Sequence, residues 1–157
     1  HRRMIDALSD STLAAALRGS ATLYLLVTAA HILGIALLIG AILPLDLRLA
    51  GAFPRTPLPA IAPLLRGTAL AGLTLATLTG AVLFSANPAE YLTNPAFRLK
   101  LLLLAAAVLN AALVTRSPAW ARILSGDPPA PHLRAMAVLS AILWVATLLA
   151  GRWIGFL

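Results

Sequence analysis

Four long apolar runs, separated by short polar or proline-rich stretches, dominate the hydropathy pattern of the chain. We place them at about residues 21–43, 59–85, 95–115 and 133–156. An α-helix rises about 1.5 Å per residue, so each run is long enough to cross roughly 30 Å of hydrocarbon. Backbone polar groups in lipid need partners within their own segment, which favours helices. Because the connections are short, the pattern predicts an all-α membrane protein, an antiparallel up-down-up-down four-helix transmembrane bundle.

Proline and capping residues indicate where these helices begin and end. Asn94 followed by Pro95 is typical of a helix start, because asparagine caps free N–H groups and proline has none to leave unpaired. Pro44 is expected to end the first helix, with FPRTPLP filling the loop that follows. The stretch SGDPPAP is expected to separate the third helix from the fourth.

The stretch SDSTLAAALRGS, which precedes the first run, predicts a short helix at about residues 9–18, capped by Ser9 or Asp10. We interpret it as an amphipathic N-terminal surface helix on the membrane, with a frayed terminus as the alternative. The first long run exceeds the apolar core of a signal peptide and no small-residue cleavage site follows it, so we expect it to remain as a spanning helix.

Small residues recur every four positions on the second predicted helix and therefore share one face. They are Thr68, Gly72, Ala76 and Gly80. Such a face lets another helix, or a flat ligand, approach the backbone closely. Of these two interpretations we favour helix packing.

Composition supports membrane insertion of the whole chain as one domain, residues 1–157. Hydrophobic residues make up 61% of the sequence and charged residues 11%, whereas soluble domains carry about 25% charged residues. The net charge of +7 comes from basic residues scattered around the apolar runs, an arrangement typical of headgroup anchoring rather than nucleic-acid binding. Because cysteine is absent, disulfides and thiolate metal sites are excluded.

The basic residues also indicate an orientation. Six arginines lie in or beside the first and third interhelical loops: Arg48, Arg55, Arg66, Arg116, Arg122 and Arg134. Basic loops tend to stay in the cytoplasm. We therefore expect a multi-pass protein of the bacterial inner membrane with periplasmic termini.

His31 is the ionisable residue at the centre of the first apolar run. A polar group at this depth is costly unless it is paired, which makes it a candidate functional residue. Gly34 and Tyr24 lie about one or two helical turns away, and the glycine leaves room for a planar ring. A structural hydrogen bond from His31 to a threonine or a backbone carbonyl is the alternative interpretation.

Lys100 and Arg152 lie near the ends of the third and fourth helices, at the same predicted membrane edge as Arg98 and Tyr24. From the helical rise, this layer is roughly 10 Å from His31. Snorkelling to lipid headgroups would explain the cations. A bound anion would also explain them, and haem b fits this description, with iron at His31 and propionates at Lys100 or Arg152. A quinone would suit the histidine but has no carboxylates for the cations.

Second axial ligands and other chemistry are hard to find in this sequence. His132 belongs to a loop, and Met136 lies roughly 13 Å from the level of His31, so neither is expected to be the second ligand within one chain. Asn110 is another polar residue at depth, suited to joining helices or to touching a ligand. Asp46 is interpreted as structural, with Arg48, Arg66 or Arg134 as its partner. Hydrolytic motifs are missing, and whether the protein is an enzyme stays open.

Three stretches, YLLVTAAHILGIALLIGAILPLDLRLAG, YLTNPAFRLKLLLLAAAVLNA and GRWIGF, resemble an uncharacterised family of four-helix bacterial inner-membrane proteins. The histidine of the first helix, with the F-x-x-K-L-L-L-L opening of the third, is also similar to the HemJ-type protoporphyrinogen oxidases. That second resemblance implies a haem b site involving His31 and Lys100. The chain departs from the pattern later in the third helix, where Asn110 lies near the place expected for a histidine.

These observations lead to two hypotheses. The first is a membrane-embedded haem b or porphyrin protein for electron transfer or for quinone or porphyrin redox chemistry, with His31 as the iron ligand. The second is a cofactor-free accessory subunit of a larger respiratory or photosynthetic complex. In both, the partners are the lipid bilayer and other membrane subunits or further copies of the chain.

Overall fold

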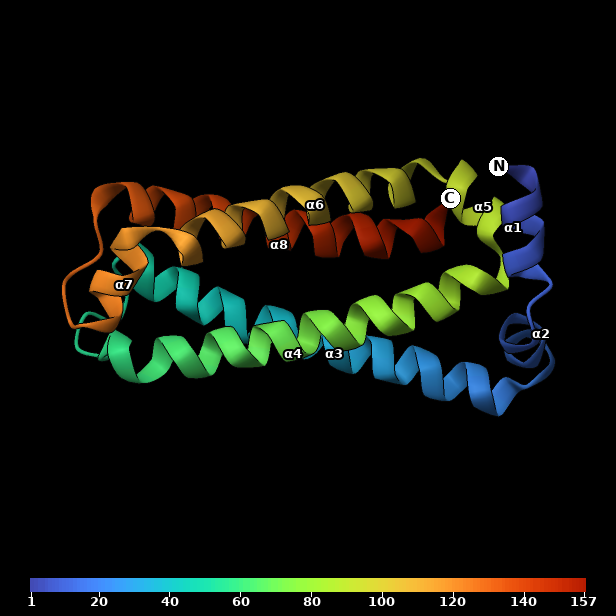
Figure 1. Ribbon diagram of the computed structural model, residues 1–157, viewed down its shortest axis with the longest axis horizontal. Helices are drawn as coiled ribbons and strands as arrows, with labels where there is room; N and C mark the ends of the chain where they lie inside the picture. Colours follow the sequence, from blue (N-terminus) through green and yellow to red (C-terminus); the bar gives the residue numbers. More distant parts are fainter.

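The computed structural model describes all 157 residues, and it is built from helices alone. Four helices are long and apolar enough to cross a membrane, which confirms the predicted four-helix membrane bundle. They are α3 (Ala21–Ala50), α4 (Leu58–Ala86), α6 (Pro95–Arg116) and α8 (Pro131–Trp153). Neighbours along the chain run in opposite directions (Figure 1).

The four long helices form two pairs. α3 packs along α4, α6 packs along α8, and contacts between α3 and α8 join the two pairs. Many leucine and isoleucine side chains on the outer faces are more than half exposed, among them Ile32, Leu102 and Leu149. These faces suit lipid chains rather than water.

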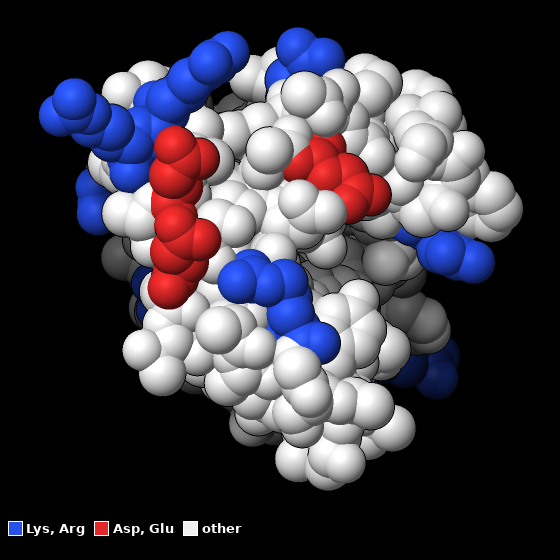
Figure 2. Space-filling model, turned by 90° about the vertical axis from the view of Figure 1, so that its right-hand side faces the viewer, with Lys and Arg blue, Asp and Glu red and all other residues white.

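Five short helices occupy the ends of the bundle. They are α1 (Arg2–Ser9), α2 (Thr12–Gly19), α5 (Pro88–Thr93), α7 (Pro118–Leu124) and the 3₁₀ helix η1 (Ile154–Phe156). Figure 2 views the end that carries α1, α2 and α5, where acidic and basic side chains lie among uncharged residues. Charges at this end would meet headgroups and water beyond the hydrocarbon.

The predicted single surface helix at residues 9–18 is wrong in its bounds, because the chain forms α1 and α2 there with a break at Asp10 and Ser11. Ser11 is the cap of α2, since its hydroxyl accepts the N–H of Ala14 at 3.2 Å. Ala14 and Leu17 are fully buried, so α2 also packs on α3 and α4.

Pro44 does not end the first spanning helix, contrary to expectation. α3 continues through Pro44 to Ala50 and ends at Gly51, whose φ of 119° is left-handed. A proline ring presses on the carbonyl of the residue four positions earlier, which here is Gly40. Ending the helix in lipid would leave more backbone groups unpaired than one proline does.

The predicted start at Asn94 is confirmed, because its Oδ1 accepts the N–H groups of Ala96 and Phe97.

α3 and α4 touch through glycines. A Cβ at Gly72 would lie 2.5 Å from the backbone nitrogen of Leu38, and one at Gly34 would lie 2.6 Å from that of Ala76. At this crossing the helix backbones are therefore in direct contact, as the small-residue spacing on the second helix predicted.

Candidate functional site

A cavity of about 640 Å³ opens between the two helix pairs near the α5 end of the bundle. His31 of α3, Lys100 of α6 and Arg152 of α8 all line it, and most of the other lining residues are apolar. Its size is in the range of cavities that hold cofactors and other small organic ligands, roughly 300–1,000 Å³. We call it the His31 cavity.

His31 is held by a threonine of the neighbouring helix. Its Nδ1 lies 2.9 Å from the Oγ1 of Thr79. That hydroxyl donates its one hydrogen to the carbonyl of Leu75, at 2.6 Å, so it can only accept from the ring. In the neutral imidazole, Nδ1 is then the N–H and Nε2 carries the lone pair. This arrangement prepares Nε2 to bind a metal or to accept a hydrogen bond.

Gly80 leaves room for the ring of His31, because it has no side chain. A Cβ there would lie 3.3 Å from the ring carbon Cε1. The small-residue face of α4 therefore has two uses, because Gly72 contacts a helix and Gly80 contacts the histidine side chain.

The two cations of the cavity have no acidic partner among its lining residues, since the wall contains no aspartate or glutamate. Lys100 lies along α8, where a Cβ at Gly151 would come within 3.5 Å of its Nζ. The guanidinium of Arg152 lies 4.8 Å from the ring centre of Phe156. The cavity thus has a net positive lining that favours an anionic ligand group.

An aromatic wall, which the sequence pattern did not predict, closes one end of the cavity. Phe84 and Phe97 stack with their ring centres 5.7 Å apart, and Tyr91 of α5 lies 5.3 Å from Phe97. Burial, with smaller contributions from Tyr24 and Glu90, raises the pKa of the Tyr91 phenol, so its O–H remains a donor. The clue in the sequence was the pair of aromatic residues that flank Asn94 and Pro95 at the start of the third spanning helix.

The other four predicted site residues do not line this cavity. Tyr24 is about half exposed and Arg98 is exposed, so both face outward. Gly34 is covered by the backbone of α4. Asn110 donates to the carbonyl of Met136 at 3.0 Å, and it borders a different cavity.

A metal at His31 would need its other ligands from outside this chain. His132 was expected in a loop but is an exposed residue in the first turn of α8, and Met136 lines the other cavity. No group of three or more histidine, aspartate or glutamate side chains is placed to hold a metal ion. A macrocycle that brings its own nitrogen ligands would meet this requirement.

The ion pair expected for Asp46 is not formed. Arg48 instead donates to the carbonyl of Thr56 at 2.8 Å, and Asp46 is buried with its Oδ2 unpartnered. Asp46 lines a cavity among the spanning helices. Arg48, two residues further along α3, points in another direction and bonds to the loop.

No protein-family model, curated protein or solved structure matches the chain. The family resemblances therefore stay predictions.

Proposed function

We propose that this protein binds haem b in the His31 cavity and serves membrane electron transfer or redox chemistry. His31 would be the axial ligand, and Lys100 and Arg152 would hold the propionates. The observation that carries the proposal is one apolar cavity that combines an oriented imidazole with two cations and no acid.

The residues present fit the group in three respects. The volume of about 640 Å³ is adequate for a flat tetrapyrrole. The stacked Phe84 and Phe97 offer a flat apolar surface at one end. A hydrogen bond from Nδ1 to a fixed acceptor is the usual way in which a protein orients a ligating histidine. When bound, the haem would supply one-electron redox chemistry, and the chain would supply binding, orientation and exclusion of water.

A quinone fits the same cavity less well. Its carbonyl oxygens need donors, and the hydrogen bond to Thr79 leaves Nε2 of His31 without a proton to give. Lys100 is a donor, but a quinone has no negative charge to match both cations.

We further infer that the protein lies in a bacterial inner membrane with both termini in the periplasm. Six of the chain's eleven arginines lie in the loop between α3 and α4, in the segment between α6 and α8, or in the adjoining ends of these helices. By the tendency of basic loops to stay in the cytoplasm, that end is the inner one. The His31 cavity would then lie toward the periplasmic side.

The test compares two histidine variants in detergent-solubilised protein incubated with haemin. The unmodified chain is expected to give a Soret band and about one haem per chain by the pyridine haemochrome assay. His31→Ala should abolish this stoichiometric binding, while His132→Ala, which changes an exposed residue in the first turn of α8, should leave it unchanged. Circular dichroism of each variant checks that the helices persist. Equal binding by both variants, or no binding by the unmodified chain, would overturn the proposal.

A second pair tests the propionate contacts. Lys100→Gln should weaken haem binding about tenfold, the effect of losing one charge-assisted hydrogen bond. Arg98→Gln is the matched control, because Arg98 belongs to the same helix but lies outside the cavity. An equal effect of the two substitutions would contradict the proposed contact between Lys100 and the propionates.

A further inference from the structure

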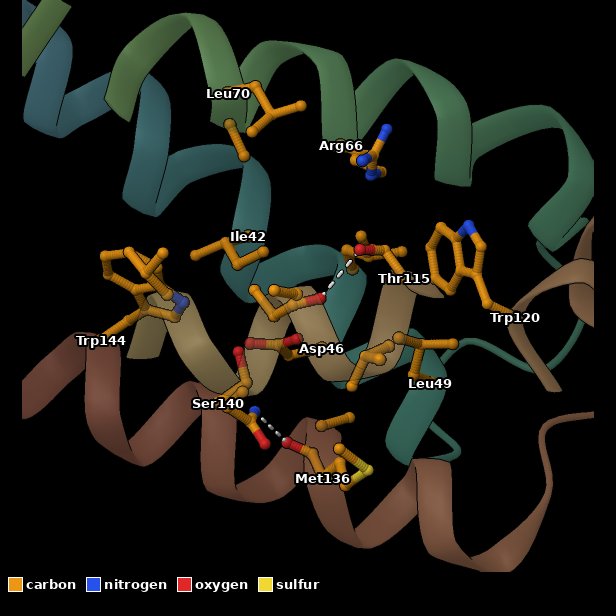
Figure 3. Close-up of a pocket in the computed structure, with 18 of the residues that line it drawn as sticks. Ile42, Asp46, Leu49, Arg66, Leu70, Thr115, Trp120, Met136, Ser140 and Trp144 are labelled. Atoms are coloured by element: carbon orange, nitrogen blue, oxygen red, sulfur yellow. Dashed lines mark hydrogen bonds between the residues drawn. The ribbon is translucent and has the colours of Figure 1, made fainter. Parts of the chain in front are cut away.

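A second cavity, of about 210 Å³, is lined by Trp144, which also lines the His31 cavity. We call it the Asp46 cavity. α3, α4, α6 and α8 form its walls, with Trp120 of α7 at one end. In Figure 3 Asp46 lies next to Ser140, and Thr115 and Arg66 lie on the side of Asp46 away from Ser140.

Two buried polar atoms in this cavity have no hydrogen-bond partner. Asp46 is 4% exposed and its Oδ2 is unpartnered, and Trp144 is 2% exposed with an unpartnered Nε1. In Figure 3 the indole nitrogen lies on the side of the ring that faces Asp46. Buried polar groups are paired in nearly all native structures, so two such atoms at one cavity indicate an occupant.

The two atoms define the chemistry of that occupant. A carboxylate oxygen accepts hydrogen bonds, whereas an indole N–H only donates them. The ligand must therefore offer both a donor and an acceptor, and a hydroxyl group offers both. Arg66 and Arg116 line the same cavity, which disfavours a cation, and the carboxyl group disfavours an anion. A neutral hydroxylated ligand meets all of these conditions.

Size and lining narrow the class further. Apolar residues make up most of the wall, and Trp120 and Trp144 supply aromatic surfaces for a ring. A cavity of about 150 Å³ accommodates benzene, so about 210 Å³ accepts a six-membered ring with small substituents. The wall includes the exposed Leu70 of α4 and Val108 of α6, so a tail has a route toward lipid.

We propose that the Asp46 cavity binds the ring of a lipid-soluble phenol or quinol, with its hydroxyl groups on Asp46 and Trp144. Oδ2 of Asp46 accepts from one hydroxyl, and Nε1 of Trp144 donates to a hydroxyl oxygen. The site is separate from the His31 cavity, and its occupation does not require haem.

The test titrates decylhydroquinone into lipid nanodiscs that hold the haem-free protein. The readout is the fluorescence of Trp120 and Trp144 in a Trp153→Phe background, because Trp153 lies outside both cavities. Saturable quenching is expected for the hydroquinone. Its dimethyl ether keeps the ring and tail but cannot donate, and it should bind at least about tenfold more weakly.

Variants locate the binding. Asp46→Asn should weaken hydroquinone binding about tenfold, whereas Asp127→Asn, which changes an exposed carboxyl, should have no effect. Ala112→Leu fills the cavity from α6 without touching the polar groups, and it should block binding. It serves as the second test if Asp46→Asn changes the helix content in circular dichroism.

Three results would overturn the proposal. The first is equal binding of the dimethyl ether, which would mean that the hydroxyl donors are unused. The second is hydroquinone binding that survives Ala112→Leu, or that is equal in Asp46→Asn and Asp127→Asn. The third is a fluorescence change produced by sodium ions in place of the hydroquinone, which would identify a cation site.

Discussion

The contact between α3 and α4 allows a sharp prediction, because four glycines on these two helices differ only in what surrounds them. A methyl group at Gly72 would lie 2.5 Å from the nitrogen of Leu38 and 2.7 Å from the carbonyl oxygen of Gly34. Both are backbone atoms, so no side-chain rotation relieves the clash. At Gly67 and Gly40 a methyl group would meet nothing within 4 Å. We therefore predict opposite effects of the same substitution at different glycines.

The magnitude follows from two terms. Replacing glycine by alanine inside a helix stabilises it by about 1 kcal/mol. Overpacking a tight contact costs about 1–3 kcal/mol, and a clash with backbone is at the upper end because the helices must separate. Gly72→Ala should thus lose about 1–2 kcal/mol net, while Gly67→Ala should gain up to about 1 kcal/mol. The expected difference between the two variants is about 2–3 kcal/mol.

The measurement is reversible unfolding of the purified protein in mixed micelles with increasing sodium dodecyl sulfate, followed by circular dichroism. The midpoint should fall for Gly72→Ala and Gly34→Ala, and stay level or rise for Gly67→Ala and Gly40→Ala. Equal midpoints across all four variants would refute the direct backbone contact.

Two further predictions concern side-chain hydrogen bonds. Thr79→Val removes the acceptor for Nδ1 of His31, and loss of such a partner typically weakens a metal site about 10–100-fold. Haem affinity should fall by that amount in Thr79→Val and be retained in Thr79→Ser. Unchanged affinity in Thr79→Val would contradict the assigned tautomer. Asn94→Ala removes both the cap of α6 and the hydrogen bond to the carbonyl of Ile154. It should lower the free energy of unfolding by about 1–3 kcal/mol, whereas substitution of the exposed Asn87 by alanine should change it little. Equal unfolding midpoints for the two variants would show that the cap is dispensable.

The spanning helices could be predicted from the sequence because their signal is length and hydrophobicity, which lipid enforces on any chain. The predicted starts of the second, third and fourth agree with the structure within about two residues, a normal uncertainty for helix ends. The prediction for Pro44 was wrong because a proline ends a helix most easily where water can satisfy the backbone groups that the break leaves unpaired. Lipid offers no such partners. The short helices α5 and α7 were missed because neither is long enough to show a hydropathy period.

The candidate site could also be predicted only in part from the spacing of residues along the helices. The rise per residue gives depth, which is why His31, Lys100 and Arg152 were expected at neighbouring levels. Depth does not fix the direction around a helix axis. Arg98 precedes Lys100 by two residues, a rotation of roughly 200° at 3.6 residues per turn, and so faces the other way. Asn110 and Gly34 face other helices for the same reason.

Trp144 lines both the His31 cavity and the Asp46 cavity. Leu38 of α3 and Leu73 of α4 also line both cavities, so these three side chains form a shared wall. A rotation of the Trp144 ring would move part of this wall and so change the shape of both cavities. A ligand that fixes the orientation of Trp144 in one cavity would therefore also fix the shape of the other cavity.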